Sequence, residues 1–267
     1  MKKRIISAII MLAISIPLLI IGGTPFLIFM GLLGCFGLYE LIKLREKDDY
    51  KLPFLVKVIS YLSMLYIIFN NTDNGLIYLD LDYRLISLLV FVFLIPVVLI
   101  GNDKKYSFLD GFYLMGSVFL VGFSLNVASL IRIQSLNLFL YLLLITVCTD
   151  TFSLVTGMLI GKTKLAPSIS PKKTIEGLIG GTLMGTFVAV MFYITLVNKD
   201  VSLFTITTCT MCLSLMGQIG DLVFSSIKRH YKVKDFSNLI PGHGGILDRF
   251  DSIIFVVLMY IFFLGII

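Results

Sequence analysis

Four aspartates in the C-terminal half of this chain stand inside or beside long apolar segments. They are Asp150, Asp221, Asp248 and Asp251. An ionised carboxylate is costly in apolar surroundings, so ionisable residues at such positions are candidates for function. Asp248 and Asp251 are three residues apart and would share one face of a helix. Helix capping and a favourable contact with the helix dipole are the structural alternative for these two. Because four carboxylates are expected at a similar depth in the membrane, we favour a functional role for them.

Basic residues accompany these carboxylates in two segments, Gly161–Glu176 and Ser225–Arg249. Carboxylates repel phosphates, so both fit one site when a cation lies between them. Mg²⁺ suits this role because it binds one or two carboxylates together with phosphate oxygens and water. The combination predicts metal-bridged phosphate chemistry. Attraction to anionic lipid headgroups is the alternative, but it explains the interleaved Asp, His and Gly residues poorly. The basic residues of the two segments are Lys162, Lys164, Lys172, Lys173, Lys228, Arg229, Lys232, Lys234 and Arg249.

A glycine-rich run, Pro241–Gly245, leads directly into Asp248. Three glycines in five residues would let the backbone approach a ligand closely and turn sharply into a helix. The exposed N–H groups at that helix start would favour an anion. His243 lies in this run and could act as an acid, a base or a hydrogen-bond donor. A purely structural histidine is an equally strong interpretation.

The composition places the chain in a membrane. Of its 267 residues, 58% are hydrophobic and only 14% are charged, and the mean hydropathy is +0.99. A soluble domain has about a quarter of its residues charged, so a water-soluble enzyme is excluded. Disordered and disulfide-stapled secreted proteins are excluded by the same numbers. We expect an all-α integral membrane protein.

Apolar runs long enough to cross a bilayer as helices of about 20 residues recur along the chain. The first run begins after three basic residues, as a signal peptide would. No small-residue cleavage site follows it, so we expect a retained helix. The nine predicted spans are Ile5–Ile21, Pro25–Ile42, Leu52–Phe69, Leu85–Ile100, Gly111–Ile131, Leu136–Ile160, Gly177–Val197, Ser202–Phe224 and Phe250–Ile267.

The basic residues also predict the orientation, because Lys and Arg concentrate in short cytoplasmic loops. With a cytoplasmic N-terminus and nine crossings, 19 of the 22 basic residues lie on the cytoplasmic side, and only Arg84, Arg132 and Lys199 lie outside. The catalytic segments would then face the cytoplasm, as in a multi-pass protein of the cell (inner) membrane. We divide the chain near residue 110 into an N-terminal membrane part (1–110) and a catalytic part (111–267) with two loops, 161–176 and 225–249. The net charge of +6 then indicates orientation and phosphate binding, with no nucleic-acid partner.

The residues from Ser225 to Asp251 resemble the signature of the phosphatidate cytidylyltransferase, or CDP-diacylglycerol synthase, family. They read S-S-I-K-R-x4-K-D-x-S-x2-I-P-G-H-G-G-I-L-D-R-F-D. Upstream, Gly217-Gln-Ile-Gly-Asp221-Leu and the run from Lys164 to Gly177 also look like family motifs. Before Asp150 the resemblance is loose, and it rests on Arg4-Ile-Ile-Ser-Ala and Tyr39-Glu40. Two positions depart from the pattern: Ser153-Leu154 replaces Ala-Tyr, and Phe224 replaces an acidic residue.

The resemblance implies that phosphatidic acid and CTP react, with Mg²⁺, to give CDP-diacylglycerol and pyrophosphate at a membrane. It also suggests a homodimer. We assign Asp221 and Asp248 as leading Mg²⁺ ligands, with Asp251 as a third candidate, and the carboxylate count leaves room for a second cation. Asp150 would orient a basic residue. Phosphates would be held by Lys172, Lys173, Lys228, Arg229 and Arg249. Further substrate contacts would come from Ser170, Thr174, Lys234, Gly244 and Gly245, with His243 as a catalytic candidate.

Two other classes of protein compete with this interpretation. A transporter for an anionic substrate would place its charges near the midplane, between repeated halves, whereas here they gather in one half of the chain. Another lipid-phosphate enzyme is the second rival. A CDP-alcohol phosphotransferase would carry a D-G-x2-A-R helix that is not found, and a polyprenol kinase would release a nucleoside diphosphate instead of pyrophosphate.

Overall fold

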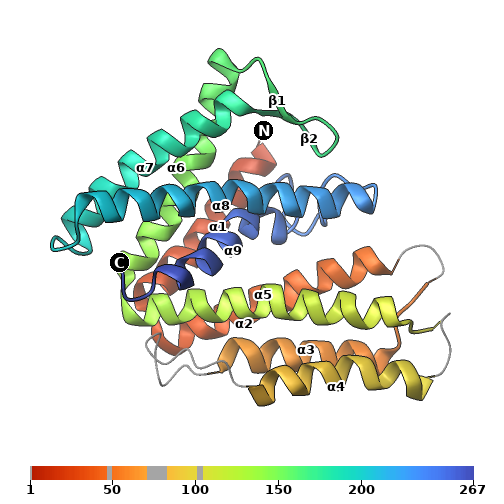
Figure 1. Cartoon of the computed structure of the whole chain (residues 1–267). Coiled ribbons are helices and arrows are strands. Elements are labelled where there is room, and N and C mark those ends of the chain that lie inside the picture. The colour runs from red at the N-terminus through yellow and green to blue at the C-terminus, as the bar shows by residue number, and fades with distance from the viewer. Residues whose placement is uncertain (1, 47–49, 71–82, 101–104) are drawn as a thin grey trace. The chain divides into compact units, whose positions relative to one another are not determined.

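The computed structural model is almost entirely α-helical in the residues it describes, with one two-stranded hairpin (Figure 1). The described residues are 2–46, 50–70, 83–100 and 105–267. Their contacts divide the chain into two compact units. The first unit comprises Met1–Gln134 and Phe236–Leu247, and the second comprises Ser135–Asp235 and Asp248–Ile267.

The first unit is a helical bundle in which one long helix contacts three others. Its helices are α1 (Lys2–Ile21), α2 (Gly23–Arg45), α3 (Phe54–Phe69), α4 (Tyr83–Ile100) and α5 (Phe108–Gln134). Helix α5 packs against α2, α3 and α4, and these four run side by side in Figure 1. Leu38, Met64 and Leu114 are completely buried in this bundle. The apolar stripes of the four helices therefore form its core.

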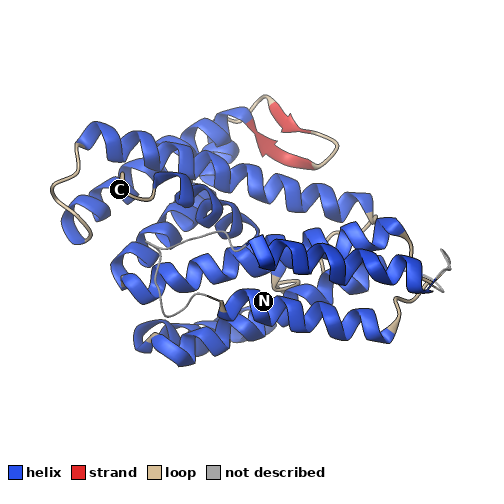
Figure 2. Ribbon diagram, turned by 60° about the horizontal axis from the view of Figure 1, so that its bottom comes forward, coloured by secondary structure: helices blue, strands red, loops and turns tan. Residues whose placement is uncertain are grey.

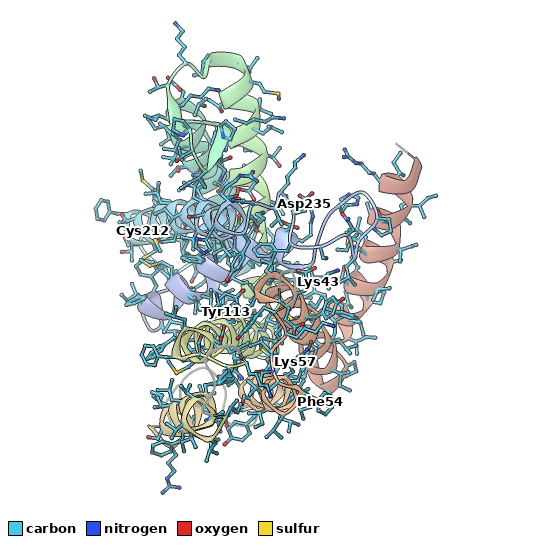
Figure 3. All side chains as sticks on the ribbon, turned by 90° about the vertical axis from the view of Figure 1, so that its right-hand side faces the viewer. Lys43, Phe54, Lys57, Tyr113, Cys212 and Asp235 are labelled. Atoms are coloured by element: carbon cyan, nitrogen blue, oxygen red, sulfur yellow. The ribbon has the colours of Figure 1, made fainter. Side chains whose placement is uncertain are left out.

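A buried carboxylate joins α2 to the start of α5. Asp110 accepts a hydrogen bond from Arg45 Nε at 2.5 Å, one from the Ser107 hydroxyl at 2.6 Å and one from the Tyr50 hydroxyl. Charge-assisted bonds of this kind offset the cost of removing a carboxylate from water. Figure 3 looks onto this end of the bundle, where Lys43 and Tyr113 are labelled. The basic end of α2 is thus fixed to α5 by polar contacts.

The second unit contains three long helices, the hairpin and most of the last helix. Its elements are α6 (Leu136–Ile160), β1 (Lys164–Ala166), β2 (Ser170–Thr174), α7 (Ile175–Leu196), α8 (Leu203–His230) and α9 (Leu247–Tyr260), which is followed by the 3₁₀ turn Ile261–Phe263. Strands β1 and β2 are antiparallel and pair Lys164 with Thr174. Figure 2 shows the hairpin, in red, at the junction of α6 and α7.

Helices α6 and α7 approach each other closely because small residues line their interface. A Cβ atom at Gly181 would lie 2.7 Å from the Thr149 carbonyl oxygen, and one at Gly185 would lie 3.0 Å from the Thr149 Cα atom. The hydroxyl of Thr174 caps α7 by accepting a hydrogen bond from the Gly177 amide at 3.1 Å. The glycines let the two helices and the hairpin between them pack as one close layer.

The structure confirms the predicted all-α membrane architecture. Each predicted span overlaps a described helix, but the last helix ends at Tyr260 and is followed by a 3₁₀ turn to Phe263, whereas this span was predicted to reach Ile267. Six of the described helices are long and apolar enough to cross a bilayer: α1, α2, α5, α6, α7 and α8. Helices α3 and α4 are apolar but shorter, and α9 has 14 residues. Nine crossings and a cytoplasmic N-terminus stay predictions. Lys47 and Lys104, which contribute to the charge count, lie outside the described residues.

Two further local features differ from expectation. Helix α8 continues to His230, whereas a loop was predicted from Ser225. The basic side chains of its last turn are favourable at a helix C-terminus, and the Ser225 hydroxyl donates to Asp221 one turn earlier, at 3.2 Å. The second feature is the hairpin itself, since the segment Gly161–Glu176 was expected to be an irregular loop.

Alanine should have opposite effects on stability at a glycine inside the close α6–α7 contact and at a glycine outside it. Gly181→Ala should lower stability by about 1–3 kcal/mol, because its Cβ atom has no room. Gly116→Ala, in the interior of α5, meets nothing within 4 Å and should raise stability by about 0.5–1 kcal/mol. Thermal unfolding of the purified protein in detergent measures both. A midpoint for the Gly181 variant equal to or above that of the Gly116 variant would contradict the packing.

Candidate active site

Two lysine–aspartate ion pairs lie in the second unit. Lys173 Nζ of strand β2 is 2.6 Å from Asp221 Oδ2 of α8. Lys228 Nζ of α8 is 2.7 Å from Asp248 Oδ1 in the first turn of α9. The Lys228 and Asp248 side chains are only 9% and 5% exposed. The first pair joins the predicted segment Gly161–Glu176 to α8, and the second joins the two ends of the predicted segment Ser225–Arg249.

Two further carboxylates complete this group. Asp150 and Asp251 each lie within electrostatic range of Asp221 and repel it. The Ser252 hydroxyl donates to Asp150 Oδ2 at 3.3 Å. Helices α6, α8 and α9 thus each contribute an acidic side chain. We call the six residues Asp150, Lys173, Asp221, Lys228, Asp248 and Asp251 the charged cluster.

The donor set of the charged cluster fits a divalent cation that arrives with phosphates. Four carboxylates face two lysines, so the cluster has an excess of negative charge when all four are ionised. In the parts of the chain that the structure describes, no three His, Cys, Asp or Glu side chains form a complete metal-binding group. Mg²⁺ is usually held by one or two carboxylates and completes its shell with phosphate oxygens and water. Asp221 and Asp248 are the two carboxylates that the sequence predicts as its ligands, and each is paired with a lysine.

Arg229 makes two hydrogen bonds that the sequence did not predict. Its Nε donates to the Ile169 carbonyl oxygen at 3.1 Å, and its NH1 donates to the Val233 carbonyl oxygen at 2.8 Å. The guanidinium group therefore links the hairpin turn to the segment that follows α8.

The remaining predicted phosphate and substrate residues of the second unit lie around the hairpin and the helix ends. Lys172, Lys234 and Arg249 are exposed. Ser170 is partly exposed at the start of β2. Thr174 is 5% exposed, and its hydroxyl is engaged in capping α7. Thr174 is thus placed to shape the hairpin rather than to reach solvent.

The predicted glycine-rich residues belong to the first unit. His243 Nδ1 lies 2.8 Å from the Ser7 hydroxyl of α1. Gly244 is paired with Ile240 through a short bridge and has a φ of 87°, a conformation that favours glycine. The run Pro241–Gly245 is therefore a defined turn, and its histidine is held by α1.

Two residues with close polar contacts were missing from the predicted site. Ser252 contacts Asp150, and nothing in its spacing signals this contact. Glu40 is fully buried in α2 and accepts hydrogen bonds from Ser237, Ile246 and Leu247. It is an ionisable residue within a predicted span, so the rule that selected the four aspartates could have found it.

Known proteins resemble this chain along almost its whole length. The model of a family described as the cytidylyltransferase family matches residues 2–267. Relatives named phosphatidate cytidylyltransferase occur in Staphylococcus haemolyticus (36% identity over 257 residues), Staphylococcus aureus strain COL (36% over 258 residues) and Staphylococcus epidermidis strain RP62A (37% over 257 residues). Each alignment covers 96% of this chain and 96% of the relative.

Proposed function

This chain belongs to the cytidylyltransferase family, and we propose that it is a phosphatidate cytidylyltransferase. It transfers CMP from CTP to phosphatidate, which gives CDP-diacylglycerol and pyrophosphate for phospholipid synthesis. The observation that carries the proposal is the charged cluster, in which Lys173 and Lys228 pair with Asp221 and Asp248. Acidic groups for a cation and basic groups for phosphates lie side by side there.

The reaction is a displacement at phosphorus. A phosphate oxygen of phosphatidate attacks the α-phosphorus of CTP and forms the new P–O bond. The bond from the α-phosphorus to the oxygen that bridges to the β-phosphorus breaks, and pyrophosphate leaves with that electron pair. The second pKa of a phosphate monoester is about 6, so the nucleophile is already ionised and no strong base is needed.

The barrier is the approach of two polyanions, and it is lowered by positive charge and positioning. Lys173 and Lys228 supply charge from within the cluster. Lys172, Lys234 and Arg249 would contact phosphates from exposed positions, while Arg229 keeps the two loops together. His243, Gly244 and Gly245 would contact substrate from the turn of the first unit, and Ser170 from the hairpin.

Asp221 and Asp248 would hold the divalent cation, which we assign as Mg²⁺, with Asp251 as a further candidate. When bound, the cation neutralises phosphate charge and stabilises the departing pyrophosphate. Asp150, which receives a hydrogen bond from Ser252 and lies within electrostatic range of Lys173, would orient that lysine. The four carboxylates leave room for a second cation.

The protein is multi-pass, as its six long apolar helices indicate. We further propose nine crossings of the cell membrane, a cytoplasmic N-terminus and catalytic segments that face the cytoplasm. The division near residue 110 into a membrane part and a catalytic part belongs to the same proposal. So does a homodimer.

The activity itself can be tested directly. The purified protein in detergent, given phosphatidate, CTP labelled in the cytidine, and Mg²⁺, should form a labelled lipid and release pyrophosphate. Release of a nucleoside diphosphate instead would indicate a kinase. Absence of a labelled lipid, together with substrate-dependent anion flux in vesicles, would indicate a transporter.

The cation assignment predicts a specific loss in one variant. Asp221→Asn should lower kcat by on the order of 100-fold or more and raise the Mg²⁺ concentration for half-maximal rate, because the amide is a weaker ligand. Asp221 is 26% exposed, so the fold should survive, which a thermal unfolding curve checks. Asp200→Asn, at an exposed position in the α7–α8 turn, is the matched control. Activity of the Asp221 variant within about threefold of the control would remove Asp221 from the cation site.

The orientation predicts different labelling of the two ends of α7. Ser168 lies in the hairpin turn that precedes α7, and Asp200 follows this helix. In a background without the four native cysteines, a membrane-impermeant maleimide added to intact cells should label Asp200→Cys and not Ser168→Cys. Opening the cells should expose Ser168→Cys as well. The reverse pattern would invert the topology.

A further inference from the structure

Glu40 is a fully buried acidic side chain near the end of α2. Its exposed fraction is 0%, and it lies in a helix that is long and apolar enough to cross a membrane. Burying an ionised carboxylate is costly unless hydrogen bonds satisfy it. The donors described next come from residues about 200 positions further along the chain.

These donors lie at the two ends of the segment Phe236–Leu247. At the start of the segment, the Ser237 hydroxyl donates to Glu40 Oε1 at 2.6 Å. At its end, the Ile246 amide donates to Oε1 at 2.8 Å and the Leu247 amide donates to Oε2 at 2.9 Å. One carboxylate therefore ties both ends of the segment together. We call Phe236–Leu247 the glycine-turn segment.

The fit around this carboxylate is tight on the side of the turn. A Cβ atom at Gly245 would lie 2.4 Å from Glu40 Oε1, so any larger residue at that position would displace the carboxylate. Gly242 and Gly244 have φ values of 81° and 87°, which give the segment its sharp turn. The conformation that carries His243 thus depends on contacts between α2 and the ends of the segment.

Helix capping accounts for part of this arrangement. The amides of Ile246 and Leu247 stand at the start of α9, where backbone donors lack partners within the helix and a negative charge is favourable. Capping alone does not require the bond to Ser237 or the close contact with Gly245. Those two contacts fix the turn that precedes the helix.

We propose that Glu40 is a positioning residue for the cytidylyltransferase reaction, since its carboxylate holds the glycine-turn segment in the shape that presents His243, Gly244 and Gly245 to the substrate. The inference rests on the proposed function. Glu40 does not touch the substrate. Leu247, which it anchors, directly precedes Asp248 in the chain.

Steady-state kinetics of Glu40→Gln test the proposal. The amide places a donor group where a backbone N–H already donates, so the segment should shift. We expect kcat/KM for CTP to fall by on the order of 10–100-fold, as when a supporting hydrogen bond around a site is lost, with a clear rise in KM. Gly245→Ala should reproduce this change by forcing the carboxylate away. Ser237→Ala, which leaves both amide bonds, should have the smallest effect.

Asp110→Asn is the matched control for a structural role. Asp110 is likewise a buried carboxylate of the first unit, held by Arg45, Tyr50 and Ser107. This variant should lower the unfolding midpoint and the fraction of active enzyme while leaving KM for CTP unchanged. If Glu40→Gln and Gly245→Ala behave in the same way, with KM unchanged, Glu40 is structural only and the proposal is overturned.

Hydrogen–deuterium exchange supplies a readout that needs no activity. In the substrate-free protein, Glu40→Gln and Gly245→Ala should speed exchange of the amides in residues 239–247, and Asp110→Asn should not. Unchanged exchange in both variants would also overturn the proposal. If the wild-type protein forms no CDP-diacylglycerol, the proposed function fails, whereas an active wild type with unaltered variants refutes only the role of Glu40.

Discussion

A charged side chain inside an apolar helical bundle needs a partner, and this requirement organises both units of the protein. In the first unit, Asp110 is satisfied by Arg45 and Tyr50. The guanidinium of Arg132 donates to the carbonyl oxygens of Leu19 and Ile20 at the end of α1. In the second unit, Lys228 and Asp248 pair where both are nearly inaccessible. The polar contacts therefore decide which helix ends lie together, while apolar packing of this composition would tolerate many arrangements.

Much of the fold could be predicted because a bilayer leaves a chain few choices. Backbone groups must be satisfied within the segment, so each long apolar run is mostly helical, and the predicted spans match the described helices to within a few residues at their ends, except that the last helix ends at Tyr260 and not at Ile267. The other failures came where the polar segments begin. Helix α8 extends through Ser225–His230. Its last turn is basic and therefore looked like a loop in the sequence, but Lys228 is satisfied there by pairing with Asp248 of α9. The strands of the hairpin Lys164–Thr174 are too short for an alternation of polar and apolar residues to be recognised.

The sequence predicted residue types for the site, but few of the contacts that these residues make. Spacing alone brought Asp248 and Asp251 onto one helix face, and the signature brought Lys228 into the same group. Nothing in the sequence showed that Arg229 bonds two carbonyl oxygens or that Thr174 caps α7. A motif records which side chains are present, whereas their partners depend on packing between segments far apart in the chain. Glu40 is the clearest case, because its donors lie about 200 residues away.

The composition of the charged cluster has a consequence for selectivity in a membrane rich in anionic lipids. Unpaired lysines near the surface of such a membrane would attract any acidic headgroup, and bulk lipid would then occupy them. Here each of the two lysines already has a carboxylate partner, and the remaining carboxylates repel an anion that arrives alone. A phosphate accompanied by its own divalent counter-ion meets no such repulsion. In the proposed function, the cluster would therefore discriminate between ligands by the cation they bring, before any group specific to a nucleotide is recognised.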